Sequence, residues 1–270
     1  MAIQDWLKPE TQDPESERRE AAKESILSAY LLMRMGVGIL GTALPALLLL
    51  GDWFFANGTP TARGSLSAYY YSGMRDVLVG ILFAVAPLLI TYRLFGGGRD
   101  NIRSTIAGVA ALGVALFPTG RPSGSTASLT ALQDRLGEGT VELIHYGFAA
   151  TFIGCLMIIS LGFARGFAEQ AKDQQTQPVD RTAHFSPRFW EWFHRLANVA
   201  IVAGVTFIII TEILDVLNGY ALLIGESVVC IAFGASWLAK GMDFDVLRSR
   251  KRSMQAGSGQ PAQNPMAAGR

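Results

Sequence analysis

Residues 196–211 read LANVAIVAGVTFIIIT, a run without a charged side chain that decides the solvent in which this chain folds. An α-helix rises about 1.5 Å per residue, so a run of this kind is close to the length that crosses a hydrocarbon core of about 30 Å. Comparable apolar runs occupy Leu27–Leu50, Ala68–Tyr92, Ile102–Phe117, Val141–Ala164, Leu196–Asp215 and Leu217–Ala239. We therefore expect an all-α fold, a polytopic membrane helix bundle with about six transmembrane helices.

Composition supports the bilayer as solvent and excludes some partners. The 270 residues are 50% hydrophobic and 17% charged, which is too apolar for an ordinary soluble domain. A net charge of +1 provides no broad basic surface, so the expected partner is the lipid bilayer and not a nucleic acid. The sequence identifies no protein partner. Cys155 and Cys230 both lie in apolar runs, where neither a disulfide nor a thiolate metal site is expected.

The distribution of positive charge predicts the orientation in the membrane. Alternate segments between the expected helices hold 18 and 3 Lys and Arg residues. Cytoplasmic loops carry an excess of these residues, so the bias places both termini in the cytoplasm. Arg34 lies near the inner end of the first expected helix, where its side chain can reach the interface.

We expect three regions along the chain. Residues 1–26 form a cytoplasmic N-terminal arm, 27–240 the transmembrane domain, and 241–270 a disordered cytoplasmic tail with a basic start. The cytoplasmic loop 165–195 is expected to contain an interfacial helix that leads into the fifth span, with His184 and His194 in solvent.

Aromatic residues and glycines agree with these boundaries. Trp53–Phe55 and Tyr69–Tyr71 would form an outer interfacial belt, and Trp190, Trp192 and Trp237 an inner one. A stacking platform formed by the three tyrosines is the alternative interpretation. The glycines of 36–41 (GVGILG) match the spacing of a dinucleotide-binding loop but lie inside a span, so they predict close helix packing.

Ionisable residues near the outer ends of the helices form the sharpest functional lead, and we call them the polar layer: Arg75, Asp76, His145, Glu212 and Glu226. The three carboxylates lie about 21–24 Å from the cytoplasmic ends of their helices, with His145 slightly higher. Charged groups at such depths tend to face a bundle interior and mark function. The alternative is structural, with Arg75 pairing Glu226 or Glu212 and locking helices together.

Two chemical interpretations of this layer can be written. Asp76, His145 and Glu226 offer oxygen and imidazole ligands for Zn²⁺ or a harder divalent ion, the only cofactor that the residues suggest. Ser67, His145 and Asp76 supply the residue types of a Ser-His-Asp hydrolase. No nucleophile-elbow sequence accompanies them, so that match carries little weight.

Three sequence segments resemble an uncharacterised family of six-helix bacterial inner-membrane proteins. They are YYY at 69–71 with Arg75-Asp76 and Val79-Gly80, ALGVALFPT at 111–119, and Glu226-Ser227 followed by FGASWLAKG at 233–241. The resemblance implies an inner-membrane location and supplies no activity. A remoter similarity is to the membrane hydrolase superfamily of alkaline ceramidases and adiponectin-receptor-like proteins. That superfamily implies a histidine-bound zinc, whereas this chain has one histidine within a span.

Three functions follow as hypotheses. The first is a membrane protein whose outer polar layer is a small-solute, proton or ion site. The second is a metal-dependent intramembrane lipid hydrolase, and the third is a structural or regulatory membrane protein. The sequence leaves open whether the chain is an enzyme.

Overall fold

The computed structural model describes residues 14–55, 62–92, 98–122, 125–173, 187–214, 216 and 219–258, and these residues contain helices and no strand. The elements are α1 (Pro14–Phe55), the short 3-10 helix η2 (Ser67–Tyr71), α2 (Arg75–Thr91), α3 (Gly98–Leu116), α4 (Ala131–Leu136), α5 (Glu138–Asp173), α6 (Pro187–Leu214) and α7 (Ala221–Ser258). The all-α fold class is therefore confirmed.

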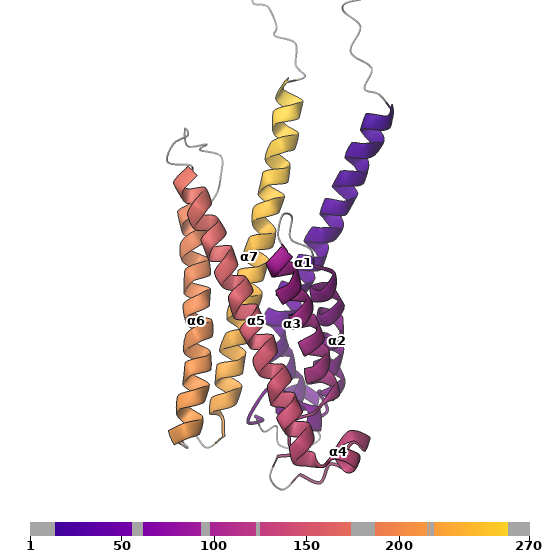
Figure 1. The fold of residues 1–270 in the computed structure, drawn as a ribbon, viewed down its shortest axis with the longest axis vertical. Helices are drawn as coiled ribbons and strands as arrows, with labels where there is room; N and C mark the ends of the chain where they lie inside the picture. The colour runs from indigo at the N-terminus through magenta and orange to yellow at the C-terminus, as the bar shows by residue number, and fades with distance from the viewer. Residues whose placement is uncertain are drawn as a thin grey trace, which may run out of the picture.

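The six long helices pack in a ring that follows chain order. Each of α1, α2, α3, α5, α6 and α7 packs against the next, and α7 closes the ring against α1. The N-terminal part of α1 and the C-terminal part of α7 leave the bundle at the same end, while α4 lies at the opposite end (Figure 1). We call the end that carries α4 and η2 the α4 end.

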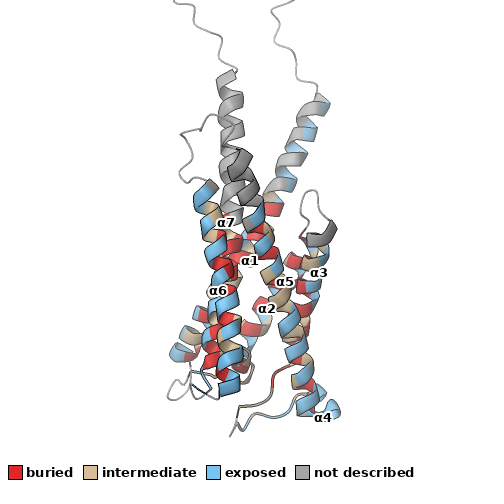
Figure 2. Cartoon of the chain, turned by 60° about the vertical axis from the view of Figure 1, so that its left-hand side comes forward, coloured by how far each residue is buried: buried red, intermediate tan, exposed pale blue. Residues whose placement is uncertain are grey.

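Length and surface identify the protein as membrane-embedded. Four segments are long and apolar enough to cross a bilayer: Ser28–Phe55, Glu138–Phe163, Arg188–Leu214 and Ala221–Ala239. Exposed residues follow the outward faces of the helices (Figure 2), and many of them are large and aliphatic, including Leu32, Leu143 and Ile213, each more than 70% exposed. A contiguous apolar exterior of this extent is typical of a surface that meets lipid.

The helices extend beyond the predicted membrane domain. The predicted arm 1–26 is helical from Pro14, and α7 continues to Ser258, so the prediction of a disordered tail from 241 is wrong for 241–258. Residues 259–270 lie outside the described residues. Likewise α5 runs to Asp173, inside the predicted loop 165–195.

The predicted interfacial helix and the predicted fifth span form one continuous helix. Helix α6 is continuous from Pro187 to Leu214. His194, expected in solvent, is fully buried, and its Nδ1 lies 2.7 Å from the Ser236 hydroxyl of α7. His184 lies outside the described residues. The prediction for His194 was wrong because apolar spacing before residue 196 marks a helix face equally well at an interface and inside a bundle.

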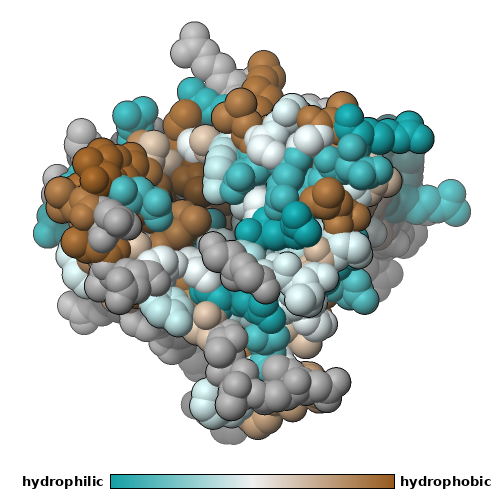
Figure 3. Space-filling model, turned by 90° about the horizontal axis from the view of Figure 1, so that it is seen from below, coloured by the Kyte–Doolittle hydropathy of each residue, from teal (hydrophilic) through white to brown (hydrophobic). Residues whose placement is uncertain are grey.

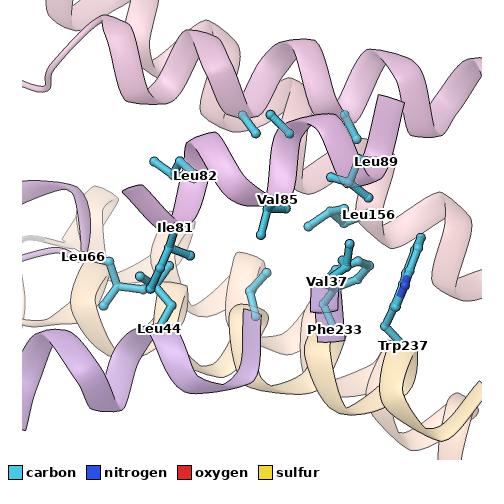
Figure 4. Close-up of a cluster of buried hydrophobic side chains, with 14 of the residues drawn as sticks. Val37, Leu44, Leu66, Ile81, Leu82, Val85, Leu89, Leu156, Phe233 and Trp237 are labelled. Atoms are coloured by element: carbon cyan, nitrogen blue, oxygen red, sulfur yellow. The ribbon is translucent and has the colours of Figure 1, made fainter. Parts of the chain in front are cut away.

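Arg34 and Trp237, both predicted near the inner interface, are fully buried in the bundle instead. The Arg34 guanidinium lies 4.8 Å from the ring centre of Phe163 and 5.8 Å from that of Trp237. Trp237 continues a line of core side chains that includes Val37 and Phe233, which point toward a common interior (Figure 4). A cation over aromatic faces is stabilised by the ring quadrupoles, which offsets part of its desolvation.

Candidate functional site

Ser67 begins η2, in the segment that joins α1 to α2 at the α4 end of the bundle. The preceding residues are held by side chains: Ser65 Oγ accepts a hydrogen bond from the Ala68 N–H at 3.0 Å. The Leu66 N–H donates to Glu226 Oε2 of α7 at 2.6 Å, a short hydrogen bond to a carboxyl oxygen. Glu226 therefore fixes this segment from across the ring and determines where Ser67 lies.

His145 of α5 is buried beside Ser67. Its Nε2 lies 3.0 Å from Ser67 Oγ, and its Nδ1 lies 2.7 Å from the Phe117 carbonyl oxygen at the end of α3. A carbonyl oxygen can only accept, so in the neutral ring Nδ1 carries the proton and Nε2 has the lone pair. The Ser67 hydroxyl consequently donates to Nε2. Two residues separated by 78 positions form one polar pair at the edge of the bundle interior.

An apolar cavity of about 90 Å³ lies inside the ring, and Ser67 and Glu226 are the polar residues of its wall. Aliphatic and aromatic side chains from α1, α2, α3, α5 and α7 form the rest, among them Leu44, Val85 and Phe152. A cavity needs only about 10–15 Å³ on this scale to hold one water, so this one is several times larger. Ser67 also borders a second, small cavity of about 10 Å³ on the His145 side.

Polar contacts hold the loop after α3 in place. The Tyr71 hydroxyl donates to the Thr119 carbonyl at 2.6 Å, and Gln133 of α4 donates to the same hydroxyl at 2.7 Å. Thr130 and Gln133 form a capping box that starts α4. Burial raises the pKa of the Tyr71 phenol, so it keeps the proton that it donates. These bonds fix the position of the Phe117 carbonyl against His145.

One further polar contact lies at this end. Arg121 binds Glu138 at the start of α5, with Nη2 3.0 Å from Oε2, and this hydrogen bond raises the pKa of Arg121. Seen from the α4 end, hydrophilic residues gather over the middle of the molecule, with hydrophobic residues at the edge on one side (Figure 3). The α4 end of the molecule therefore presents a partly hydrophilic surface.

The structure brings together only part of the predicted polar layer. Glu226 and His145 meet through the segment that carries Ser67. Arg75 is exposed and donates to the Tyr70 hydroxyl at 2.7 Å, with its guanidinium 4.4 Å from that ring centre, so the predicted pairing of Arg75 with Glu226 or Glu212 is not the contact it makes. Asp76 and Glu212 are exposed on their helices.

The proposed metal ligands are separated. In the part of the chain that the structure describes, no group of three or more His, Cys, Asp or Glu side chains could hold a metal ion. Asp76 in particular is exposed, whereas His145 is 3% exposed. The combination of Asp76, His145 and Glu226 as one ligand set therefore gains no support from this geometry.

The tyrosines at 69–71 were predicted to anchor the protein in the interface, and this prediction is wrong for two of them. Tyr69 is 1% exposed, and Tyr71 is half-buried and bonded to Thr119. Tyr70 contacts Arg75. In contrast, Trp53, Phe54 and Phe55 at the end of α1 are exposed, as an interfacial belt requires.

Sequence reasoning named Ser67, His145 and Asp76 together but did not identify the group that binds the other ring nitrogen of the histidine. That partner is the Phe117 backbone carbonyl, which precedes Pro118. Proline has no N–H and ends α3, and the last carbonyls of a helix lack partners within it. The Phe-Pro pair was therefore a signal for an available acceptor. Comparisons with family models, with curated proteins and with solved structures found no match.

Proposed function

We propose that this protein is a multi-pass inner-membrane protein that binds a small amphipathic solute in its central cavity. The apolar part of the solute fills the cavity, and its polar group lies against Ser67 and Glu226. The observation that carries the proposal is the cavity of about 90 Å³, which places these two polar side chains in an otherwise apolar wall. Ligand sites typically combine an apolar lining with a few placed polar groups.

The chemistry of the wall limits the solute. Glu226 accepts hydrogen bonds, and Ser67, which gives its proton to His145, offers its lone pairs, so the polar group should be a hydroxyl or amine that donates, or an ester whose electrophilic carbonyl carbon faces Ser67 Oγ. The cavity is smaller than the roughly 300–1,000 Å³ of a drug-sized pocket. A short alkyl chain, or the end of a longer one, is therefore the expected occupant. An isolated ion is a poorer fit because most of the wall offers it no ligand.

Orientation is the second part of this proposal. Six crossings, formed by the six helices of the ring, would place both termini in the cytoplasm, and the excess of Lys and Arg in alternate segments supports that side. Helices α2 and α3 are shorter than α1, α5, α6 and α7, but each packs between two neighbours in the ring, which supports counting them as crossings. The α4 end and the site then face the periplasm.

Binding can be tested by photocrosslinking with a diazirine derivative of hexanol. We expect crosslinks on cavity residues such as Phe152, saturable by unlabelled hexanol. Val85→Phe fills the cavity and should reduce this crosslinking at least tenfold, because Val85 is buried in its wall. The matched control is Val109→Phe, whose side chain is 50% exposed on α3 and which should crosslink like the wild type.

Ser67→Ala is a less disruptive variant than Val85→Phe, since it removes a hydroxyl from the cavity wall without adding volume. Thermal unfolding of each purified variant shows whether it is folded. Unsaturable crosslinking spread over the lipid-facing surface of a folded wild type would contradict the proposal and favour a structural role for the bundle.

Orientation can be tested with two single-cysteine variants in a background in which Cys155 and Cys230 are alanine. Asp134→Cys lies on the exposed face of α4, and Arg165→Cys is exposed near the far end of α5. In intact cells, a membrane-impermeant maleimide should label the first and should label the second only after permeabilisation. The reverse pattern would place the termini outside.

A further inference from the structure

We infer that Ser67 is a nucleophile activated by His145, and that the solute bound in the cavity is an acyl ester cleaved at this serine. The inference rests on the proposed binding function and adds a reaction to it. It is carried by the 3.0 Å contact between Ser67 Oγ and His145 Nε2 at the wall of the central cavity.

The histidine is set up as a base. Because the Phe117 carbonyl holds the proton on Nδ1, the lone pair of Nε2 faces the Ser67 hydroxyl. A nucleophile within hydrogen-bond reach of a base, with that base oriented by a third group, is the general arrangement of nucleophilic catalysis. Here a backbone carbonyl holds the imidazole tautomer, a task that a carboxylate performs in the Ser-His-Asp enzymes.

The position of Ser67 suits an acyl substrate. Its residue borders both the central cavity and the small cavity beside His145. An acyl tail in the central cavity would place its carbonyl carbon at Ser67 Oγ, with the alcohol portion directed to the His145 side. Glu226 acts as a positioning residue, because it binds the Leu66 N–H immediately before the nucleophile.

The reaction balances with water as the second reactant. Ser67 Oγ attacks the ester carbonyl carbon while its proton passes to His145 Nε2. The ester C–O bond breaks, and the leaving alcohol takes that proton. Water then attacks the acyl-serine, giving its proton to Nε2, and the carboxylic acid leaves as Ser67 regains its proton. One ester and one water become one alcohol and one acid.

A second serine–histidine pair provides a built-in comparison. Ser236 Oγ lies 2.7 Å from His194 Nδ1 and 3.0 Å from the Ser160 hydroxyl. Ser236 is fully buried, and it lines neither of the two cavities that border Ser67. Hydrogen bonding to a histidine is thus shared by both serines, and of the two only Ser67 lines these cavities.

The test is covalent labelling of the purified full-length protein with an alkyl fluorophosphonate. The probe loses fluoride to an activated serine and leaves a stable adduct. We expect a single adduct, mapped to Ser67 by peptide mass spectrometry. Labelling should disappear in Ser67→Ala and fall about 100-fold or more in His145→Gln, since a general base contributes about 10²–10⁴-fold. Ser236→Ala should label at the wild-type rate.

The pH dependence separates catalysis from structure. Labelling of the wild type should fall as pH is lowered through the titration of His145, because imidazolium has no lone pair to accept the serine proton. His145→Gln should lose this dependence.

Failure of this inference is distinguishable from failure of solute binding. A folded wild type that takes up the hexanol probe saturably but gains no fluorophosphonate adduct would overturn the reaction and leave binding intact. An adduct formed equally fast in His145→Gln would also overturn it. Adduct formation at Ser67 without saturable hexanol crosslinking would contradict the binding proposal alone.

Discussion

Trp237→Ala is expected to destabilise the bundle by about 3 kcal/mol or more, the cost of removing a large aromatic side chain from a packed interior. Trp237 is 0% exposed, and its ring centre lies within 5.3 Å of those of Tyr92, Phe163 and Phe233. Tyr92 follows the end of α2, Phe163 lies on α5 and Phe233 is one turn away on α7, so alanine would leave a void among three parts of the bundle. In a bilayer, helix association depends on packing contacts, so we expect the loss of these contacts to account for most of the loss of stability.

Trp192→Ala is the matched control. Trp192 lies on α6 and is 59% exposed, so the same substitution removes few packing contacts. We expect a change within about 0.5 kcal/mol, the usual range for surface substitutions. Unfolding of both variants in mixed micelles with increasing dodecyl sulfate measures the difference. Equal losses of stability would show that Trp237 does not hold the helices together in the way its burial indicates.

Trp237 also illustrates what the sequence could predict. A run such as 196–211 predicts both a membrane environment and an α-helix. A single apolar segment of about that length can form all its backbone hydrogen bonds within lipid only as a helix. Depth follows from counting residues. The rotation of a helix about its axis does not follow from such a count, because a tryptophan or arginine near a helix end can face either lipid or the bundle interior. The sequence predicted that Trp237 and Arg34 lie at the interface, whereas both side chains face the bundle interior.

The helix ends were predictable in part. Residues 14–27 carry signals that a charged composition conceals: Pro14 at the first helical position, and Glu15 paired with Arg19 one turn later at 2.7 Å. These favour a continuous helix, as α1 shows. The sequence analysis assigned residues 1–26 to a cytoplasmic arm from their charge and predicted no helix there, so it gave helix propensity too little weight.

The candidate site depends on contacts that a single sequence cannot supply. The distance between Ser67 and His145 depends on how α5 packs against the α1–α2 connection. The order of residues in one sequence does not say which residues of two helices lie opposite each other. The polar layer contained Glu226 and His145 because it grouped ionisable residues by their distance from the cytoplasmic ends of the helices. It also contained Asp76 and Glu212, which share that depth and face outward.

Glycine spacing on α1 was the most informative local pattern. The prediction of close helix packing by residues 36–41 is confirmed: an added Cβ at Gly38 would lie 2.9 Å from the Leu238 backbone nitrogen, and at Gly41 it would lie 3.7 Å from the Gly234 Cα. Helices α1 and α7 therefore touch through their backbones. This contact closes the ring, and it joins the first span to the helix that carries Glu226.

Gly234→Ala should separate α1 from α7. A Cβ at this position would contact the Thr42 hydroxyl and would lie 2.5 Å from the Thr42 backbone nitrogen and 2.8 Å from the Gly38 carbonyl oxygen. Backbone atoms cannot rotate away as a side chain can, so one helix must shift. Overpacking of this kind costs about 1–3 kcal/mol, which we expect to exceed the roughly 1 kcal/mol that alanine gains over glycine in a helix.

Gly80→Ala isolates the clash, because it adds the same methyl group to a helix in open space. An added Cβ at Gly80 meets nothing within 4 Å, so this variant should keep the propensity gain and unfold no earlier than the wild type. Separation of α7 would also move Glu226 away from the Leu66 N–H. Gly234→Ala should therefore weaken hexanol crosslinking even where it remains folded, whereas an unchanged crosslink in a destabilised variant would show that the site does not depend on this helix contact.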